Sequence, residues 1–203
     1  MSSMRSCIED ILRQEADAIL NIPPSEHIAQ AIDTLYQRVH QEQGKVVVSG
    51  MGKAGQIGIN IATTFCSTGT PAIFLHPSEA QHGDLGIIQA HDVLLLLSNS
   101  GKTREILELI GLADKLHRDL PCIVITGNPD SPLAKCRAIV LHTGGPKEVC
   151  PLGLTPTTST TTMTVLGDIL TVLMMTRIGF KAEDYAKRHH SGYLNTKARQ
   201  PSQ

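Results

Sequence analysis

The chain has 203 residues, 41% of them hydrophobic, and a formal net charge of -1. This length suits one large domain with a full core, and a nearly neutral chain has no overall attraction for nucleic acid or anionic membrane surfaces. Aromatic residues make up only 3% and tryptophan is absent, which argues against stacking platforms for bases or sugar rings.

The cysteines and the chain start point to a reducing compartment. Five cysteines occur singly, with no paired spacing that would indicate a disulfide framework or a zinc ribbon. The N-terminus carries charges among its apolar residues, so we expect no signal peptide. The most apolar stretch, at about 163–175, is too short to span a bilayer and contains Asp168. We therefore expect a soluble, cytoplasmic protein without nucleic-acid or membrane partners.

Two amphipathic helices are expected before the first strand. The first has apolar residues at 8, 11, 12, 19 and 20 and is broken by Pro23 and Pro24. Ser25 can cap the second, whose inner face would carry Ile28, Ala31, Ile32, Leu35 and Val39. Such helices either pack against a neighbouring subunit or cover a sheet edge, and the sequence leaves both alternatives open.

Apolar runs predict strands at 45–49, 71–75, 93–97, 122–126 and 138–141. Helical spacing follows the first run at about 56–66 and the third from 106, and a short helix is expected around 133–136. Alternation of this kind predicts right-handed crossovers and a three-layer α/β/α sandwich with a five-stranded parallel sheet. Ligands bind such sheets at the carboxyl ends of the strands.

The first strand ends in Gly-Met-Gly-Lys-Ala-Gly at 50–55, which matches the dinucleotide fingerprint. A NAD site also needs an acidic residue at the end of the second strand, but that strand ends in His76 and Pro77. NAD is therefore disfavoured. The glycines still allow a ligand to approach the backbone closely, with Lys53 beside it.

The segment at 78–86, before the third strand, is dense in histidine and acidic residues. It is either a functional loop or simply a capped short helix and turn.

The third strand stops at Ser98-Asn99-Ser100-Gly101, before a helix. A tight polar turn from strand to helix presents backbone N–H groups and the positive end of a helix dipole, which suits a phosphate. The hydroxyls of Ser98, Ser100 and Thr103 supply further donors. A Walker A loop would need a glycine where Leu96 stands, so a nucleotide P-loop is disfavoured. An ordinary serine-rich turn is the remaining alternative.

The loop at 144–153 is stiffened by prolines and contains Glu148, which is either a solvated surface charge or a functional carboxylate. A threonine-rich stretch at 155–164 continues into an apolar helix, so its hydroxyls should gather at the start of that helix. A short charged segment at 183–190 and a polar tail at 197–203 end the chain.

Together these motifs resemble the sugar isomerase (SIS) domain, and more narrowly the D-arabinose 5-phosphate isomerases of the Kdo and capsule pathways. The resemblance covers about 46–189 and is carried by SGMGKAG at 49–55, HP at 76–77 with HGDLG at 82–86, SNSG at 98–101, EVCPLG at 148–153 and TTSTT at 157–161. It implies one flavodoxin-like SIS domain over 1–203, with N-terminal helices at 1–43, an α/β core at 44–178 and a C-terminal segment and tail at 179–203.

The resemblance implies interconversion of D-ribulose 5-phosphate and D-arabinose 5-phosphate by a homo-oligomer, usually a tetramer, without a cofactor. The implied catalytic positions are Lys53, Glu105, Glu148 and His189, with His82 as a further candidate. The expected substrate-binding residues are Ser49, Gly50, Gly52, Gly69, Thr70, His82, Ser98, Asn99, Ser100, Gly101 and Thr103. His76 and His82 are plausible ligands for adventitious zinc.

Aldose–ketose isomerisation needs a base, a group that manages protons at the two oxygens, and a phosphate anchor. Glu148 is our first choice as the base and Glu105 the second, with the expectation that a crevice raises the carboxylate pKa. His189 or His82 would open the ring or polarise the carbonyl, and Lys53 would neutralise the enediolate. A phosphosugar-binding regulatory module and an isomerase of another phosphosugar are the alternatives.

This sequence departs from the family pattern in three places. Lys102 stands where members usually have Glu, and His190-Ser191 replaces the Pro-Gly after His189. Many members carry a following pair of CBS domains, and we expect a short form without them.

Overall fold

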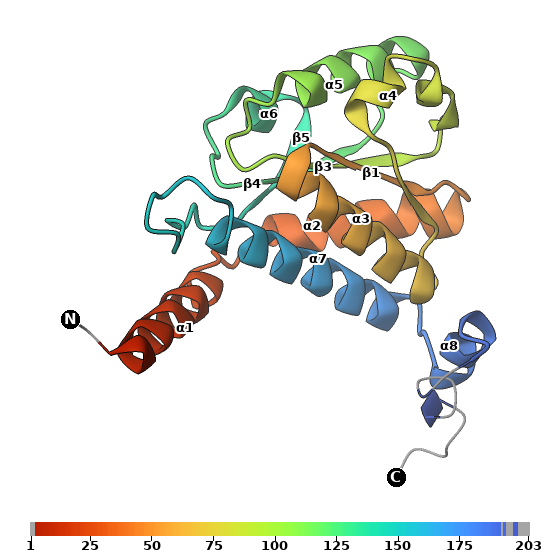
Figure 1. Cartoon of the computed structure of the whole chain (residues 1–203). Helices are drawn as coiled ribbons and strands as arrows, with labels where there is room; N and C mark the ends of the chain where they lie inside the picture. The colour runs from red at the N-terminus through yellow and green to blue at the C-terminus, as the bar shows by residue number, and fades with distance from the viewer. Residues whose placement is uncertain (1–2, 192, 194–196, 199–203) are drawn as a thin grey trace.

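The computed structural model describes residues 3–191, 193 and 197–198, so residues 199–203 of the expected polar tail lie outside the described residues. Five parallel strands form one sheet with helices on both of its faces (Figure 1). This is the predicted three-layer sandwich.

The elements follow one another in the predicted alternation. The strands are β1 Val46–Gly50, β2 Ala72–Phe74, β3 Val93–Leu97, β4 Cys122–Thr126 and β5 Ala138–His142. The α-helices are α1 Met4–Leu20, α2 Glu26–Leu35, α3 Gly52–Ser67, α4 Pro77–Ala80, α5 Arg104–Leu116, α6 Pro132–Lys135, α7 Thr158–Arg177 and α8 Ala182–Arg188. A π-helical turn, η1 Tyr36–Gln41, extends α2, and a 3-10 turn, η2 Asp84–Ile87, follows α4.

The strand order is β2-β1-β3-β4-β5, which is the flavodoxin-like order. From β1 the chain adds β2 on one side and then β3, β4 and β5 on the other, so the switch point lies between β1 and β3. Side chains of the central strands alternate between two cores, because successive residues of a strand point to opposite faces. On β3, Val93, Leu95 and Leu97 join the core under α2, α3 and α7, while Leu94 and Leu96 join the core under α5. Both faces of β3 are therefore buried, which explains its uninterrupted apolar run.

The strand predictions at 93–97 and 122–126 are confirmed without change. The helix expected from about 56 is wrong at its start, because α3 begins at Gly52. A side-chain Cβ at Gly55 would lie 2.7 Å from the carbonyl oxygen of Gly50. The glycines therefore let the first turn of α3 fold back onto the end of β1, where a loop was expected.

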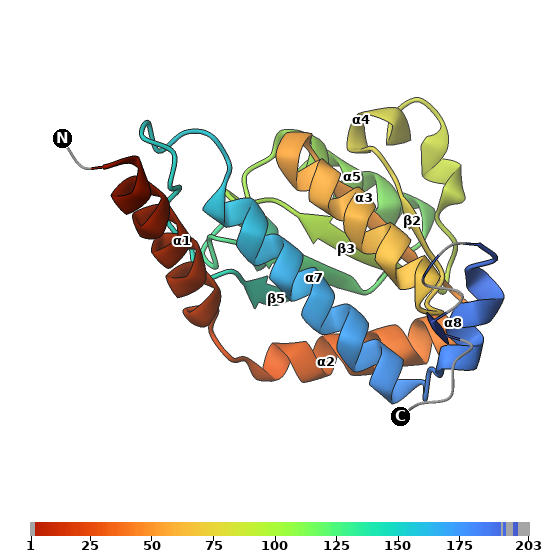
Figure 2. The ribbon, with the colours of Figure 1, turned by 60° about the horizontal axis from the view of Figure 1, so that its bottom comes forward.

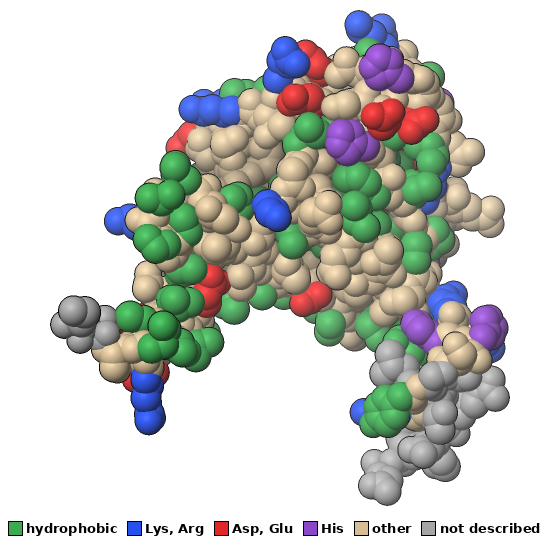
Figure 3. Space-filling view, viewed as in Figure 1, with side chains coloured by type: hydrophobic (Ala, Val, Ile, Leu, Met, Phe, Trp, Pro, Cys, Tyr) green, Lys and Arg blue, Asp and Glu red, His purple; other side chains and the backbone are tan. Residues whose placement is uncertain are grey.

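The two N-terminal helices differ in what they cover. Inner-face residues of α2 enter the core as predicted, so this helix covers the sheet. By contrast α1 buries no residue, lies beside α7 and projects from the body (Figures 1 and 2). Figure 3 shows hydrophobic side chains gathered on it; the exposed ones are Met4, Ile8, Ile11, Leu12 and Leu20.

Within the described residues, no single helix is both long and apolar enough to cross a membrane. One strongly bent pair, α7 with α8 at 116°, passes on length and composition alone.

Candidate active site

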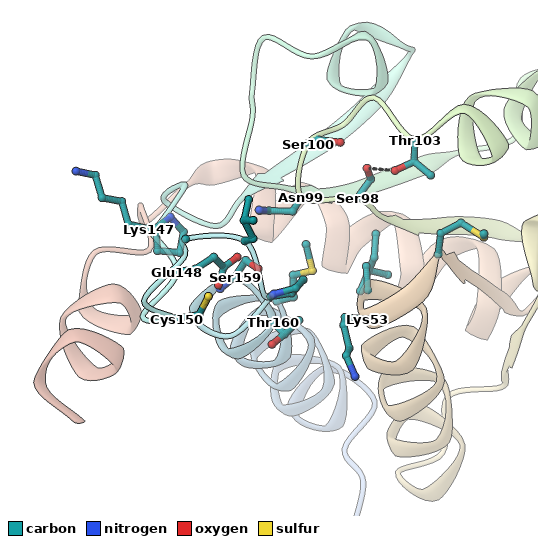
Figure 4. Close-up of a pocket in the computed structure, with 18 of the residues that line it drawn as sticks. Lys53, Ser98, Asn99, Ser100, Thr103, Lys147, Glu148, Cys150, Ser159 and Thr160 are labelled. Atoms are coloured by element: carbon teal, nitrogen blue, oxygen red, sulfur yellow. Dashed lines mark hydrogen bonds between the residues drawn. The ribbon is translucent and has the colours of Figure 1, made fainter. Parts of the chain in front are cut away.

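A cavity of about 810 Å³ opens at the carboxyl ends of β1 and β3 (Figure 4). Three segments that are far apart in the sequence form its walls: the first turn of α3, the turn from β3 to α5, and the loop at 146–156 with the start of α7. Of the predicted site residues, the cavity brings together Lys53, Ser98, Asn99, Ser100, Thr103 and Glu148.

The turn between β3 and α5 is held by its own hydrogen bonds. The hydroxyls of Ser98 and Thr103 share one at 2.8 Å, and Ser98 Oγ also accepts from the N–H of Gly101 at 3.1 Å. Gly101 has a φ of 62°, and a Cβ there would collide with a neighbouring side chain. Ser98 is buried, whereas Asn99 and Ser100 are exposed to the cavity. The turn is thus rigid before any ligand arrives, with Ser100 as its accessible hydroxyl.

Glu148 binds the start of α7. Its Oε2 accepts from the N–H of Thr157 at 2.7 Å, from Thr157 Oγ1 at 2.9 Å and from the N–H of Ser159 at 3.2 Å. N–H groups in the first turn of a helix have no partner within the helix, and the dipole there favours a negative charge. Glu148 therefore caps α7 from outside the helix.

These bonds reverse the expected pKa shift of Glu148. Burial on its own would raise the pKa, but the hydrogen bonds from Ser159 and Thr157 outweigh it and hold the pKa below its ordinary value. The expectation of a raised pKa for Glu148 is therefore wrong. The carboxylate is ionised near neutral pH and can accept a proton without first losing one.

Two cationic side chains and a thiol accompany Glu148. Lys53 extends from the first turn of α3 at the side of the cavity, whereas Lys147 points away from it (Figure 4). Cys150 lines the same loop, and its Sγ accepts from the N–H of Thr155 at 3.3 Å. The N–H groups of Thr155 and Leu154 lower the pKa of the Cys150 thiol to about 7.

Several predicted catalytic residues do not line this cavity within one chain. Glu105 is half-buried in the first turn of α5, and His82 lies exposed between α4 and η2. His189 stacks on Tyr185 with ring centroids 3.7 Å apart and lines a second cavity beside α3 and β2.

Only some of the predicted substrate-binding residues line the cavity. Ser49 is buried, and its hydroxyl donates to the carbonyl of Leu75 at 2.7 Å. Gly50, Gly52 and Gly101 shape the two turns without lining the cavity. Gly69 and Thr70 follow the C-terminal end of α3, at the opposite edge of the sheet.

The segment at 77–86 forms a short helix and turns, which was the alternative to a functional loop. The Nδ1 atom of His76 is buried without a hydrogen-bond partner in the described part of the chain. Among those residues no group of three or more histidine, cysteine or acidic side chains is placed to hold a metal ion.

The cavity residues that sequence reasoning did not assign to the site include Cys150, Ser159 and Thr160. The threonine-rich stretch gave a partial signal, because we expected its hydroxyls at the start of a helix. What was hidden is that this helix end faces the turn after β3.

Comparison with known proteins identifies relatives over most of the chain. A family profile described as SIS domain matches residues 40–173. The arabinose 5-phosphate isomerase KdsD of Shigella flexneri is 44% identical over 189 residues, which cover 93% of this chain and 56% of that protein. The chain thus spans about half the length of the curated relatives it matches.

Solved structures agree with this grouping. A Bacteroides fragilis protein described as a candidate phosphosugar isomerase involved in capsule formation is 61% identical, with a TM-score of 0.93 over 94% of this chain and 100% of that one. The Escherichia coli CFT073 protein c3406, solved in complex with arabinose 5-phosphate, is 34% identical, with a TM-score of 0.84 over 93% of this chain and 100% of that one.

Proposed function

The chain belongs to the SIS domain family, and from that membership we propose that it is an aldose–ketose isomerase that interconverts D-ribulose 5-phosphate and D-arabinose 5-phosphate. One observation carries the proposal: the turn after β3, Lys53 and Glu148 meet in one cavity. Relatives named arabinose 5-phosphate isomerase, and a 34%-identical structure that holds arabinose 5-phosphate, support the choice of substrate.

We assign the phosphate to the β3–α5 turn and the chemistry to Glu148. The base takes a proton from C1 of D-ribulose 5-phosphate, which leaves an enediolate across C1 and C2. The resulting carboxylic acid returns a proton to C2, O1 loses its proton to become the aldehyde oxygen, and O2 gains one. Lys53 would neutralise the charge that develops on the enediolate.

Among the described residues, no histidine lines the cavity that holds Lys53 and Glu148. We assign the opening of the sugar ring to a histidine, either His189 from a neighbouring subunit or His82. Glu105, at the start of α5, is the second choice for the base. The proposal therefore includes a homo-oligomer, which we expect to be a tetramer.

The metabolic setting follows from the same relatives. We propose that the protein works in the cytoplasm and supplies D-arabinose 5-phosphate for Kdo in lipopolysaccharide or capsule. The 61%-identical Bacteroides fragilis protein, described as involved in capsule formation, supports this setting.

One observation favours a phosphosugar-binding regulatory module instead. Glu148 has a structural task as the cap of α7, so its presence alone does not require catalysis. A regulatory module would bind the same ligand through the β3–α5 turn and leave it unchanged.

The test is to incubate the purified protein with D-ribulose 5-phosphate and identify the products. We expect D-arabinose 5-phosphate to form, and Glu148→Gln to lower kcat by about 10²–10⁴ with substrate binding retained, because it keeps the shape and removes the base. Binding without turnover would support the regulatory module. If Glu148→Gln keeps its kcat and Glu105→Gln loses it, Glu105 is the base.

A further inference from the structure

Helix α1 places a carboxylate against the start of α7. Glu15 Oε1 accepts a hydrogen bond from Thr158 Oγ1 at 3.1 Å, across 143 positions of sequence. Its other oxygen, Oε2, is buried without a hydrogen-bond partner in the described residues. A buried acceptor without a donor costs free energy, so a carboxylate kept there needs an explanation.

The hydroxyl of Thr158 links Glu15 to the active-site loop. Thr158 is fully buried, and its Oγ1 accepts from the N–H of Val149 at 3.2 Å. A hydroxyl has one proton and two lone pairs. Because the Thr158 hydroxyl donates its proton in the hydrogen bond to the Glu15 carboxylate, its lone pairs are turned toward the N–H of Val149.

The neighbouring threonine repeats this arrangement with Glu148. Thr157 Oγ1 donates to Glu148 Oε2 at 2.9 Å and accepts from the same Val149 N–H at 3.2 Å. The backbone beside Glu148 is thus held by two hydroxyls, and a carboxylate orients each of them. Glu148 orients one hydroxyl itself, and Glu15 orients the other from α1.

We propose that Glu15 is a positioning residue for Glu148: through Thr158 it fixes the loop that carries the base. This inference rests on the proposed isomerase function. The task of Glu15 is to accept a hydrogen bond, so a neutral acceptor can replace it and an apolar residue cannot. Misplacing a catalytic group by about 1 Å can cost 10²-fold in rate.

The first test compares Glu15→Leu with Glu15→Gln. Glu15→Leu removes the acceptor, and we expect kcat to fall by about 10- to 100-fold with KM within about 2-fold, since the β3–α5 turn is untouched. Glu15→Gln keeps an acceptor oxygen for Thr158 and should retain kcat within about 3-fold of the wild type. The matched control is Glu9→Leu, the same change at an exposed carboxylate of α1 that pairs with Arg5; it should leave kcat unchanged.

The second test asks whether Glu15 acts through Thr158. Thr158→Val removes the hydroxyl, and we expect Glu15→Leu combined with Thr158→Val to be no slower than Thr158→Val alone, because both break one connection. Independent, multiplying losses would overturn the proposal. So would an unchanged kcat in Glu15→Leu, or an equal loss in Glu15→Gln.

A measurement without substrate separates this inference from the proposed function. Deuterium uptake by a peptide spanning 147–153 should rise in Glu15→Leu and Thr158→Val but not in Glu9→Leu, because the Val149 N–H loses an ordered acceptor. Unchanged uptake would overturn the link from Glu15 to the loop even in an active enzyme. Raised uptake in the two variants, with a wild-type protein that has no isomerase activity, would overturn the proposed function and the catalytic role of Glu15 with it.

Discussion

At the scale of single residues, the site is determined by which atoms Glu148 and Ser100 present to a ligand. Glu148 offers a carboxylate whose Oε2 is held by three donors. Ser100 offers a hydroxyl exposed to the cavity, on a turn whose backbone is fixed by Ser98 and Gly101. One residue is therefore suited to proton transfer and the other to phosphate, and each can be tested alone.

The lowered pKa of Glu148 predicts a pH dependence with a definite sign. Its ordinary value is 4.5 and the folded value is lower, so the stabilising effect of the charged cap is complete above pH 4.5 and is lost as pH falls through the folded pKa. Glu148→Gln keeps an acceptor and loses only the charge-assisted part of these bonds. Its Tm deficit relative to the wild type should therefore shrink below pH 4.5.

In the free enzyme, the acid limb of kcat/KM that belongs to Glu148 should also lie below pH 4.5. Because the phosphate of the free substrate itself titrates at about pH 6, the base is assigned to another group only if the limb at about pH 6 to 7 is also seen in kcat.

Ser100→Ala should weaken phosphosugar binding. Losing a charge-assisted hydrogen bond to phosphate costs about 1.5–3 kcal/mol, which corresponds to an increase of roughly 10-fold or more in KM. Inorganic phosphate should also compete less well against the substrate. Ser67→Ala, at the far end of α3, serves as the control and should change neither quantity. An unchanged KM in Ser100→Ala would place the phosphate elsewhere.

Residue-scale reasoning from sequence selected the β3–α5 turn and Glu148, which line one cavity, because both stand in short motifs. It gave the wrong direction for the pKa of Glu148, since the donors lie nine and eleven positions later, in a threonine-rich stretch that the sequence did not connect to Glu148. It gave no signal for Glu15, which meets Thr158 only after the whole α/β unit has folded between them.

At the scale of elements, the packing of α3 on α7 forms one wall of the site. Gly167, in the middle of α7, faces Ile61 of α3 so closely that a Cβ there would collide with the isoleucine side chain. Glycine inside a helix costs about 1 kcal/mol relative to alanine. Its place in α7 is explained by this close approach, which brings the first turns of α3 and α7 to the same cavity.

Two glycine variants test that explanation as a pair. Gly167→Ala should destabilise the fold, because overpacking costs about 1–3 kcal/mol and exceeds the gain in helix propensity. Gly111→Ala, in α5, meets no atom within 4 Å and should stabilise by about 0.5–1 kcal/mol. For a chain of this size each kcal/mol shifts Tm by about 2–4 °C. Equal increases in Tm would show that α3 and α7 have room between them.

At the element scale, prediction from sequence succeeded where an apolar run was uninterrupted and had clear ends. The runs at β3 and β4 are apolar on both faces, and their bounds were predicted without change. The start of α3 was misplaced, because a glycine-rich segment resembles a loop until the contact between Gly50 and Gly55 is known. The glycine pattern at 50–55 does carry a signal for that contact, because its last glycine allows close packing of the helix on the strand, but the pattern was weighed only as evidence for a bound ligand such as NAD.

At the scale of the whole molecule, α1 is a helix whose apolar face is left uncovered by the described residues of the chain. Met4, Ile8, Ile11 and Glu15 are spaced four, three and four residues apart, so they share one helix face. Glu15 meets α7, while the apolar residues before it are 77%, 51% and 45% exposed in chain order. A helix of 17 residues with no buried side chain has little stability of its own. We therefore assign a second copy of this chain as the occupant of its apolar face, in line with the proposed homo-oligomer.

Breaking that contact should lower activity together with the oligomeric state. Replacing both Ile8 and Ile11 by Glu puts charges on the apolar face, and we expect light scattering to report a smaller species. Its kcat should fall because α1 is no longer held where Glu15 orients Thr158. It should fall further if His189 of a neighbour opens the sugar ring, as proposed above. Arg13→Glu, a charge reversal on another face of α1, is the control and should change neither mass nor kcat. The variant and the wild type are compared at the same protein concentration, since dissociation follows mass action. A fully active monomer, in either protein, would show that one chain supplies the whole site and that the exposed face of α1 has no part in catalysis.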